Sequence, residues 1–217
     1  MVDDASTDDT RRLVRELASA NNSIRLIERD EKLGLGDAYL FAFALGLAEG
    51  YDTLVEIDAD LSHDPSVLPT MLDVADHGIS LVIGSRYIPG GTVTGWPRRR
   101  LWLSRWANRY VAIALGLAIN DATSGYRVYR ADALRQIGLE GVQASGYGFQ
   151  IEMTYRAVRA GLSVVEIPIA FTDRVAGSSK MNGHIVAEAF RLVTVWGLRD
   201  LVTLARRRRA YRTSDGD

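Results

Sequence analysis

The sequence contains no cysteine and no long hydrophobic run. Without cysteine, neither a disulfide framework nor a thiolate metal site can form, which fits a reducing compartment. The longest apolar stretch, residues 111–119, is about half as long as a helix that crosses a bilayer. The first residues are acidic and no apolar segment follows them, so we expect no secretory signal peptide. The 217 residues suffice for one domain with a substantial core, and a second full domain is not expected.

Charge is distributed unevenly along the chain, although the net charge is only −1. Residues 1–60 contain fourteen Asp and Glu against six Lys and Arg, whereas residues 86–109 contain six Arg and no acid. Four more arginines follow one another at 206–209. Arginine suits phosphate oxygens, and basic clusters are attracted to anionic membranes. The pattern therefore favours phosphate ligands and a membrane surface, while the pI of 6.3 is too low for a typical nucleic-acid-binding domain.

Apolar periodicity predicts alternating helices and strands, the pattern of an α/β fold. Asp8 and Asp9 suit the start of the first helix, and Pro65 suits the first turn of the third. The later half is more irregular, with a glycine- and proline-containing loop at 88–97. Neither an internal repeat nor an interdomain linker is visible. Helices are expected at 11–20, 36–48, 66–75, 100–117, 149–160 and 183–206, and strands at 24–27, 53–57, 79–84, 126–129 and 163–170.

Two carboxylates one residue apart, Asp58 and Asp60, come at the end of the strand expected at 53–57. Side chains alternate along a strand, so both carboxylates point to the same side. Hard oxygen ligands at the carboxyl end of a buried strand suit a divalent cation that itself carries a diphosphate. An isolated Asp-x-Asp is more often an acidic surface turn, because short motifs match by chance. Other motifs in this chain argue against that alternative.

A second acidic run, residues 2–10, reads as the end of a buried strand that turns into a helix. It does not fit a calcium loop, because Asp9 stands where glycine is needed and Arg15 where a bidentate glutamate is needed. Carboxylates at this position can accept hydrogen bonds from a base or a ribose. The glycine turn at 34–36 does not fit a dinucleotide fingerprint, because Tyr39 occupies the place of the third glycine. Both segments are better interpreted as parts of a sugar-nucleotide pocket.

Seven short motifs follow one another along nearly the whole chain, and together they are far more specific than any one of them. They are residues 2–10 with Lys32-Leu33-Gly34-Leu35-Gly36-Asp37-Ala38, Asp58-Ala59-Asp60, Gly84-Ser85-Arg86-Tyr87, Gly95-Trp96-Pro97 with Arg100 and Ser104, Thr123-Ser124-Gly125-Tyr126-Arg127, Gly146-Tyr147-Gly148-Phe149-Gln150-Ile151-Glu152-Met153, and Asp173-Arg174 with Gly177, Ser179 and Lys180. In this order they resemble the inverting GT-A glycosyltransferases of family 2, and more closely the polyprenyl-phosphate (dolichyl-phosphate) mannosyltransferases. The resemblance implies a GT-A fold, in which a Rossmann-like mixed sheet carries helices on both faces.

The resemblance also implies which residues bind the sugar nucleotide. Those that would line the guanine and ribose pocket are Val2, Asp3 and Asp4. Those that would hold the diphosphate and its divalent cation, Mg2+ or Mn2+, are Asp58, Ala59 and Asp60. Ser62 stands where some family members have glutamine near the metal, so it is a weaker candidate ligand than Asp58 and Asp60.

A third group of residues matches the positions that hold the acceptor phosphate and the donor diphosphate. It consists of Arg86, Arg100, Ser104, Arg174 and Lys180, of which Lys180 would contact the donor. Arginine stays charged at any working pH and matches phosphate oxygens with a planar fork of donors. We therefore expect Asp60 together with Arg86, Arg100 and Arg174 to carry catalysis.

The implied reaction is an inverting transfer of mannose from GDP-mannose to a polyprenyl phosphate, giving β-linked polyprenyl phosphate mannose and GDP. A lipid phosphate monoester has a second pKa of about 6, so its oxygen is anionic near neutrality and needs no general base. Two alternatives stay open: a UDP-glucose-dependent glucosyltransferase acting on the same lipid phosphate, and an inactive fragment. We expect a cytoplasmic protein, peripheral on the inner face of the membrane, with no nucleic-acid partner. A membrane-anchoring partner subunit is left open.

Residues 183–217 are expected to form an amphipathic helix with a basic tail, after a glycosyltransferase domain at 1–182. An apolar stripe followed by arginines is typical of an interfacial helix. For the first half of this helix, packing against the domain is an equal alternative. Arg98, Arg99, Arg105 and Arg109 match no motif and are interpreted as a solvated or lipid-facing helix surface. The stripe consists of Ile185, Ala189, Leu192, Val193, Trp196, Leu201 and Leu204.

The resemblance carries one expectation about the start of the chain. A family 2 domain opens with a strand and a helix that precede the strand ending in Val-Asp-Asp, and both are absent before Val2. We therefore expect that the start was assigned too late. The strands near Ile24 and Leu54 should then have unpaired edges.

Overall fold

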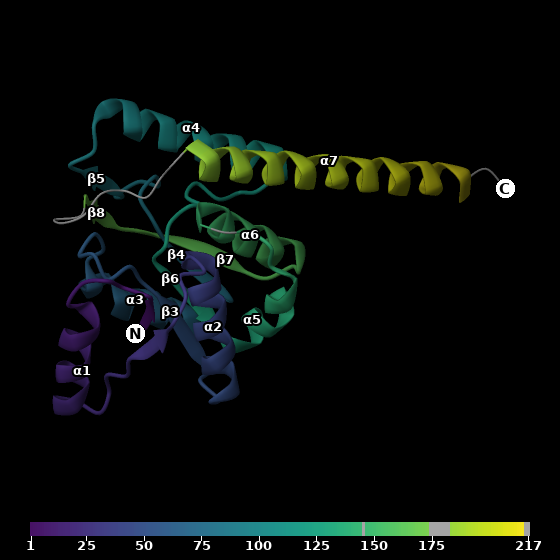
Figure 1. The fold of residues 1–217 in the computed structure, drawn as a ribbon. Coiled ribbons are helices and arrows are strands. Elements are labelled where there is room, and N and C mark those ends of the chain that lie inside the picture. The colour runs from purple at the N-terminus through teal and green to yellow at the C-terminus, as the bar shows by residue number, and fades with distance from the viewer. Residues whose placement is uncertain (145, 174–182, 215–217) are drawn as a thin grey trace.

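The computed structural model describes the backbone of residues 1–144, 146–173 and 183–214. Helices and strands alternate along most of it, as the periodicity predicts (Figure 1). The elements are β1 (Val2–Asp4), α1 (Thr10–Ala20), β2 (Ile27–Arg29), α2 (Leu35–Ala48), β3 (Thr53–Glu56), the 3-10 turn η1 (Pro65–Val67), α3 (Leu68–Asp76), β4 (Leu81–Ser85), β5 (Thr92–Thr94), α4 (Arg98–Leu115), β6 (Arg127–Arg130), α5 (Ala131–Ile137), the 3-10 turn η2 (Leu139–Gly141), α6 (Gly146–Arg159), β7 (Val164–Pro168), β8 (Ala170–Thr172) and α7 (Gly183–Ser214).

The centre of the fold is a mixed sheet of four strands in the order β3-β6-β4-β7. β6 is antiparallel to both β3 and β4, and β7 is parallel to β4. Side chains of β4 alternate between the two faces, because Leu81 and Ile83 belong to one hydrophobic cluster and Val82 to another. All three are fully buried, so both faces of the sheet are covered.

Different helices cover the two faces. On one face, α3 packs through Met71 and Ala75 against Val82. On the other face, Phe43 of α2 and Phe149 of α6 belong to the larger cluster that contains Leu81 and Ile83 of β4. The predicted α/β architecture, a mixed sheet with helices on both faces, is therefore confirmed.

The first two strands form a separate parallel pair, β1 with β2, that is not hydrogen-bonded to the central sheet. The strand expected at 24–27 begins only at Ile27. Within the described part of the chain, β3 has a neighbour on one side only, β6. This order agrees with the open edge expected at the strand that contains Leu54.

A third parallel pair, β5 with β8, was not indicated by the sequence pattern. β5 lies within the segment 88–97, which was expected to be a loop throughout. The single strand expected at 163–170 is divided into β7, which pairs with β4, and β8, which pairs with β5. β7 ends at Pro168. Beyond it, the carbonyl oxygen of Ile169 accepts the N–H of Thr92 at 3.0 Å, which brings the chain alongside β5. The short helix α5 was also not expected.

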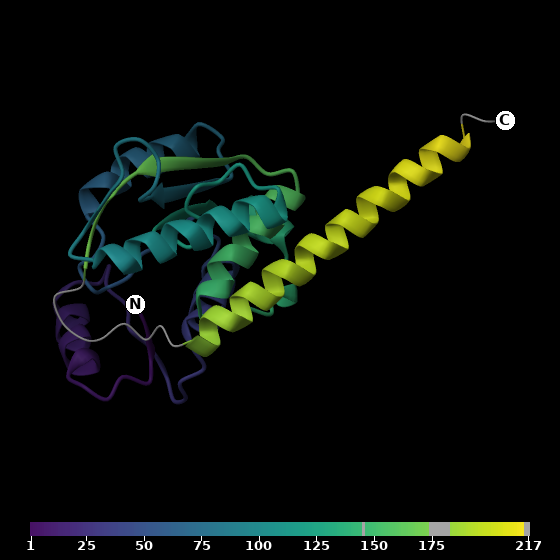
Figure 2. The same ribbon diagram turned by 90° about the horizontal axis from the view of Figure 1, so that it is seen from above.

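The last helix, α7, packs against α4 and α6 and then continues beyond the body of the protein (Figures 1 and 2). A Cβ at Gly197 would lie 2.5 Å from the carbonyl oxygen of Ala114, so glycine permits the close approach of α7 to α4. Ala189, Val193 and Trp196, assigned above to an interfacial stripe, pack against the core instead. For the first half of the helix, the packed alternative is the correct one.

The exposed face of α7 carries a different set of apolar residues, and of the expected stripe only Leu201 belongs to it. The side chains of Ile185 and Leu204 lie outside the described residues. Among the helices that the structure describes, none is long and apolar enough to span a bilayer. The exposed apolar side chains of α7 are Phe190, Leu198, Leu201 and Val202.

Candidate active site

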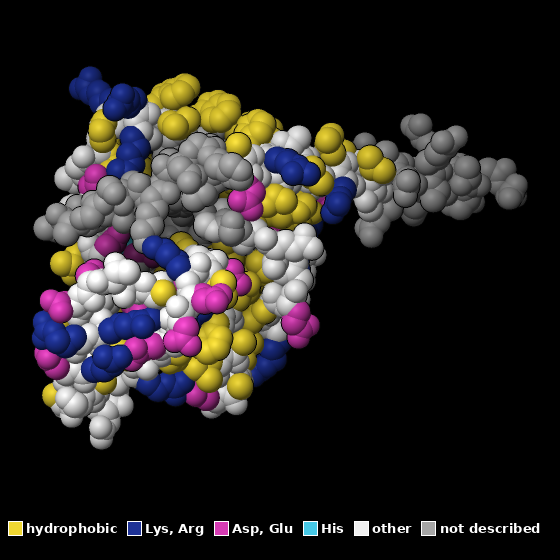
Figure 3. All heavy atoms as spheres, viewed as in Figure 1, with side chains coloured by type: hydrophobic (Ala, Val, Ile, Leu, Met, Phe, Trp, Pro, Cys, Tyr) yellow, Lys and Arg dark blue, Asp and Glu magenta, His cyan; other side chains and the backbone are white. Residues whose placement is uncertain are grey.

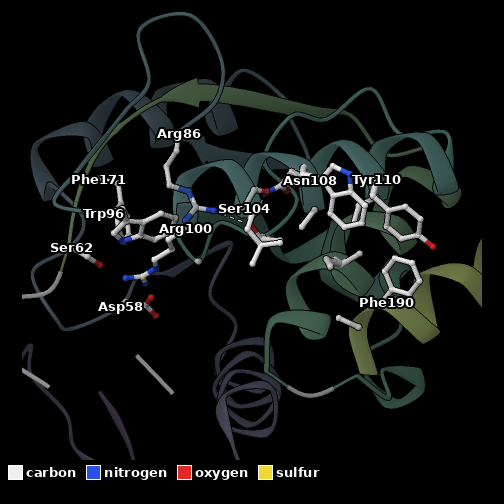
Figure 4. Close-up of a pocket in the computed structure, with 18 of the residues that line it drawn as sticks. Asp58, Ser62, Arg86, Trp96, Arg100, Ser104, Asn108, Tyr110, Phe171 and Phe190 are labelled. Carbon is white, nitrogen blue, oxygen red and sulfur yellow. Dashed lines mark hydrogen bonds between the residues drawn. The ribbon is translucent and has the colours of Figure 1, made fainter. Parts of the chain in front are cut away.

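Six of the predicted site residues line a single pocket at one edge of the central sheet (Figure 4). β3 and β4 are each antiparallel to β6, so they run parallel to each other and their carboxyl ends meet at the same edge. Such an edge is the usual place for a ligand in an α/β protein. The six residues are Asp58, Asp60, Ser62, Arg86, Arg100 and Ser104.

The acidic end of the pocket is formed by the turn after β3. The Oδ1 atom of Asp58 accepts a hydrogen bond from the hydroxyl of Tyr39 at 3.2 Å. Burial, together with the carboxylates of Glu56 and Asp58, raises the pKa of Tyr39, so its phenol stays protonated and acts as the donor. The Oδ1 atom of Asp60 accepts the N–H of Ser62 at 3.1 Å and also its hydroxyl. Both carboxylates are thus oriented by neighbouring donors.

The backbone of this turn adopts a conformation that side chains normally avoid. Leu61 has a φ of +62° and its side chain is 81% exposed, so no packing explains the strain. Gly125 approaches from the other side: a Cβ there would lie 3.4 Å from the Oδ2 atom of Asp58. The turn therefore holds Asp58 and Asp60 in a fixed arrangement with little side-chain bulk around them.

Two carboxylates and a hydroxyl are a small donor set for a metal. No group of three or more His, Cys, Asp or Glu with metal-binding geometry occurs among residues 1–144, 146–173 and 187–203, whose side chains the structure describes apart from Tyr147. Mg2+ and similar cations, however, are commonly bound by one or two carboxylates together with the phosphates of a substrate. Asp58, Asp60 and Ser62 therefore fit a cation that arrives with a diphosphate, rather than one held by protein ligands alone.

Arg86 lies deeper in the pocket and forms a buried ion pair with Asp121. Its Nε and Nη2 atoms donate to the two carboxylate oxygens at 2.7 Å each, and Nη2 also donates to Thr123 at 2.8 Å. Burial alone would raise the pKa of Asp121, but the charge and hydrogen bonds of Arg86 outweigh it and the pKa is lowered. The charge of Arg86 is thus balanced inside the protein.

Arg100 is placed differently, at the half-buried side of the pocket. Its guanidinium lies over the ring of Trp96, 4.0 Å from the centroid, which is a favourable cation–π distance. Its Nη1 atom donates to the carboxylate of Asp173 at 3.2 Å, which also accepts the indole N–H of Trp96 at 3.2 Å. Figure 4 shows Arg100 and Asp58 pointing toward each other across the pocket.

A fully buried arginine holds the loop that carries Asp121 and Thr123. The Nε atom of Arg127 donates to the carbonyl oxygen of Ser124 at 2.7 Å, and its Nη2 atom to that of Ala122 at 2.8 Å. These bonds satisfy carbonyl groups that the loop would otherwise leave buried and unpaired. The sequence indicated Arg127 only as part of a motif. In the structure it fixes the backbone of the loop that carries Asp121 and Thr123.

The other end of the pocket is an apolar arm between α4, α6 and α7. Tyr110 and Phe190 stack there with ring centroids 4.4 Å apart, and Trp106 stacks on Tyr110 at 5.9 Å. Ile151 and Val193 contribute further apolar surface. The pocket as a whole therefore joins an acidic turn, a region with two arginines and a hydrocarbon-lined channel.

His63 lies in the wall of the pocket between Tyr126 and Phe171, with ring centroids 5.2 and 5.4 Å away. Burial, reinforced by the positive charge of Arg86, lowers the pKa of His63 to about 4. Its imidazole is therefore neutral near pH 7. These contacts make His63 a structural neighbour of the turn.

Several predicted site residues do not line this pocket. Asp3 is buried on β1, where it binds Arg11, and Asp4 accepts the N–H of Gly34 at 2.9 Å. Val2 and Ala59 are also absent from the lining. The role of these residues at a base or ribose stays a prediction.

Two predicted residues, Arg174 and Lys180, lie outside the described residues, as do Gly177 and Ser179 of the same motif. The structure adds residues that sequence reasoning missed. Asn108 donates to Thr123 at 3.0 Å, and Asp121 binds Arg86 from 35 positions away. No local pattern could have paired them, because the partners are far apart in the chain.

Comparison with known proteins gives a consistent picture. Residues 1–138 match the sequence profile of "Glycosyl transferase family 2". The chain is 50% identical over 207 residues to the polyprenol monophosphomannose synthase of Mycolicibacterium smegmatis, covering 95% of this chain and 78% of that protein. It is 48% identical over 198 residues to the undecaprenyl-phosphate mannosyltransferase of Micrococcus luteus, covering 91% and 81%.

Solved structures share the fold at lower identity. Glucosyl-3-phosphoglycerate synthase from Mycobacterium tuberculosis, in complex with Mn2+ and UDP-glucose, superimposes with a TM-score of 0.60 at 23% identity. The alignment covers 89% of this chain and 65% of that one. The complex of the same enzyme with phosphoglyceric acid also gives a TM-score of 0.60, with 91% and 66% covered. The expected GT-A fold agrees with this similarity.

Proposed function

Because the chain belongs to glycosyl transferase family 2, we propose that it transfers mannose from GDP-mannose to a polyprenyl phosphate, with inversion at the sugar. The observation that supports this proposal most directly is the composition of the pocket that the six predicted site residues line. It joins a carboxylate turn, a basic region and an apolar arm, in that order. The basic region and the apolar arm suit a phosphate on a long hydrocarbon chain. The carboxylate turn suits a nucleotide diphosphate with its cation. The names of the two relatives at 48 and 50% identity support mannose and a lipid phosphate as the substrates.

On the donor side, Asp58 and Asp60 would hold a divalent cation that the donor diphosphate also binds. Bound there, Mg2+ or Mn2+ would supply positive charge to offset the charge that develops on the leaving diphosphate. Tyr39 and Ser62 orient the two carboxylates before the donor arrives, so little reorganisation is needed at that step.

On the acceptor side, Arg100 would bind the lipid phosphate. It is half-buried, and its stacking on Trp96 and its bond to Asp173 fix its direction. A phosphate monoester carries a second pKa of about 6, so the attacking oxygen is anionic near neutrality without a base. The protein must therefore bring two anions together, the lipid phosphate and the donor diphosphate, and align them. Attack from the side opposite the leaving group inverts the anomeric centre.

The apolar arm would hold the first part of the polyprenyl chain. Its walls are aromatic and aliphatic side chains from α4, α6 and α7. Each CH2 group that leaves water stabilises the complex by about 0.8 kcal/mol. The acceptor's membrane origin makes peripheral attachment at a cytoplasmic membrane surface part of the proposal.

The test is a donor and acceptor screen with the purified chain in detergent. GDP-mannose and UDP-glucose are each supplied with a polyprenyl phosphate and Mg2+ or Mn2+, and the product is identified by mass spectrometry and its anomeric coupling by NMR. We expect β-linked mannosyl product from GDP-mannose and its loss on chelation of the cation. Faster transfer from UDP-glucose would identify UDP-glucose, and not GDP-mannose, as the donor. A folded chain that transfers neither sugar would contradict the proposal.

A further inference from the structure

Two hydroxyl groups meet beside the basic region of the pocket, that of Tyr87, which follows β4, and that of Ser104 on α4. The Tyr87 phenol donates to the Oγ atom of Ser104 at 2.6 Å. Ser104 stands one helical turn after Arg100, and both side chains line the pocket (Figure 4). The motifs assign Ser104 to the acceptor phosphate, but they do not indicate what orients its hydroxyl group.

The Tyr87 ring is half-buried, and two guanidinium groups lie over it. Their Cζ atoms, of Arg86 and Arg105, are 5.2 and 5.7 Å from the ring centroid, within the range of a cation–π contact. Burial raises the pKa of Tyr87, so its phenol keeps its proton near neutrality. Tyr87 therefore presents a fixed and permanent hydrogen-bond donor to Ser104.

The hydroxyl hydrogen of Ser104 remains available for another acceptor. A serine hydroxyl has one O–H donor as well as its acceptor lone pairs, and here Oγ accepts the phenol. Serine and threonine inside a helix commonly donate to the carbonyl oxygen four residues earlier. Thr154 and Thr194 do so, at 2.9 and 2.7 Å. In the part of the chain that the structure describes, the Ser104 hydroxyl forms no such bond.

The backbone at Ser104 is tied to the loop that supports Arg86. The carbonyl oxygen of Ser104 accepts the Nδ2 atom of Asn108 at 3.1 Å, and the same amide donates to Thr123 at 3.0 Å. Thr123 also accepts the Nη2 atom of Arg86 at 2.8 Å. The outer edge of α4 is different in character, with hydrophobic side chains along it and basic ones near its start (Figure 3). Ser104 is the only serine or threonine of this helix.

We propose that Tyr87 is a positioning residue for the acceptor phosphate. By donating to the Oγ atom of Ser104, it turns the Ser104 hydroxyl hydrogen into the pocket, where a phosphate oxygen accepts it beside Arg100. The phosphate then meets a cation and a neutral donor from successive turns of α4. The donor is oriented before the ligand arrives, so binding does not have to turn it away from a helix carbonyl. This role rests on the proposed function, because it takes the lipid phosphate as the ligand of the pocket.

The test is calorimetric binding of farnesyl phosphate in detergent, with farnesol as the same hydrocarbon chain without the phosphate. Tyr87→Phe removes the phenol oxygen, Ser104→Ala removes the hydroxyl that the phenol orients, and the double variant completes a cycle. The matched control is Tyr155→Phe, which removes a phenol bond to Asp200, 3.0 Å long, between α6 and α7 and outside the pocket lining. Thermal unfolding establishes that each variant is folded.

We expect Ser104→Ala to weaken binding of farnesyl phosphate by about tenfold or more, and Tyr87→Phe by about two- to tenfold. The double variant should bind it as Ser104→Ala does, because Tyr87 acts through the Ser104 hydroxyl. Binding of farnesol and of GDP should be unchanged in every variant, and the control should behave as the parent. The KM for a polyprenyl phosphate should rise in the same order as the loss of binding.

Unchanged binding of farnesyl phosphate by Tyr87→Phe would overturn this role. So would a loss that multiplies with that of Ser104→Ala, or an equal loss of farnesol binding, because Tyr87 would then only maintain the shape of the pocket. A parent protein that binds farnesyl phosphate no more tightly than farnesol would contradict the lipid-phosphate site of the proposed function as well. The binding assay thus distinguishes failure of the positioning role alone from failure of the proposed function.

Discussion

Arg86 and Asp121 face each other in a bidentate ion pair, with both N–O distances at 2.7 Å and side-chain exposures of 7% and 0%. Arg100 lies in the same pocket but is half-buried and stacks on Trp96. The motifs assign both arginines to the acceptor phosphate. Their surroundings differ, because Arg86 pairs with a fully buried carboxylate, whereas the Asp173 carboxylate that pairs with Arg100 is 33% exposed. The two residues should therefore respond differently to substitution.

Arg86→Ala is expected to destabilise the fold. It leaves Asp121 buried without its cation, and breaking such a pair costs about 3–5 kcal/mol. The free energy of unfolding, measured with urea, should fall by an amount of that order. The control is Arg130→Ala, which removes a partly exposed pair with Asp132 that contributes less than about 1 kcal/mol. If Arg86→Ala is as stable as the parent, the ion pair of Arg86 with Asp121 does not stabilise the fold.

Arg100→Ala should leave the fold intact and weaken use of the lipid phosphate. Deleting a charge-assisted hydrogen bond to phosphate costs about 1.5–3 kcal/mol, or about ten- to a hundredfold in KM for the acceptor. The affinity for GDP, measured by calorimetry, should change little. An equal loss of GDP affinity would move Arg100 to the donor side.

Asp60→Asn should abolish transfer while the fold stays intact. An amide cannot replace the charge that a carboxylate supplies to a cation at a diphosphate. Asp64→Asn is the matched control, since Asp64 lies in the same segment but not in the pocket lining, and an asparagine there can still accept the N–H of Ser66. Metal-dependent turnover of Asp60→Asn equal to that of the parent would remove Asp60 from the site.

Short-range sequence patterns were sufficient to predict some elements of this fold but not others. The alternation of strands and helices, and the placement of Asp58 after β3, follow from periodicity within short windows. The pairing of β5 with β8 joins two three-residue strands far apart in sequence, which no local period indicates. The partnership of Arg86 with Asp121 likewise depends on the packing of distant segments. The sequence left open whether the first half of α7 packs against the domain, because apolar spacing identifies a stripe but not what covers it.

Stability should depend on pH through Glu56. Burial, only partly offset by Arg127, raises the pKa of Glu56 from 4.5 to about 8. Between these values the folded chain holds a proton that the unfolded chain releases, so this group's contribution is complete below about pH 4.5 and is lost as the pH rises to 8. Glu56→Gln cannot ionise, and its amide can still meet Gln150.

The measurement is urea unfolding of the parent and Glu56→Gln at pH 5 and pH 8, without nucleotide. The stability of the variant relative to the parent should be higher at pH 8 than at pH 5. His63 acts in the opposite sense between about pH 4 and 6.5, but it is common to both proteins and cancels in the comparison. Glu16→Gln, on the exposed surface of α1, serves as the control. Parallel behaviour of parent and Glu56→Gln would show that Glu56 is ionised in the folded state.

Ala107→Trp should discriminate between long and short acceptors. Ala107 lines the apolar arm from α4, so an indole there would occupy space that the polyprenyl chain needs. Each CH2 group forced back into water costs about 0.8 kcal/mol, so displacing two of them raises the KM for a long-chain polyprenyl phosphate by at least about tenfold. A short acceptor that does not reach the arm should keep its KM, and GDP affinity should be unchanged. Ala118→Trp, at an exposed position after α4, is the control. An equal rise for both acceptors would mean that the indole disturbs the polar end of the pocket, and no change for either would mean that the lipid chain leaves the pocket by another route.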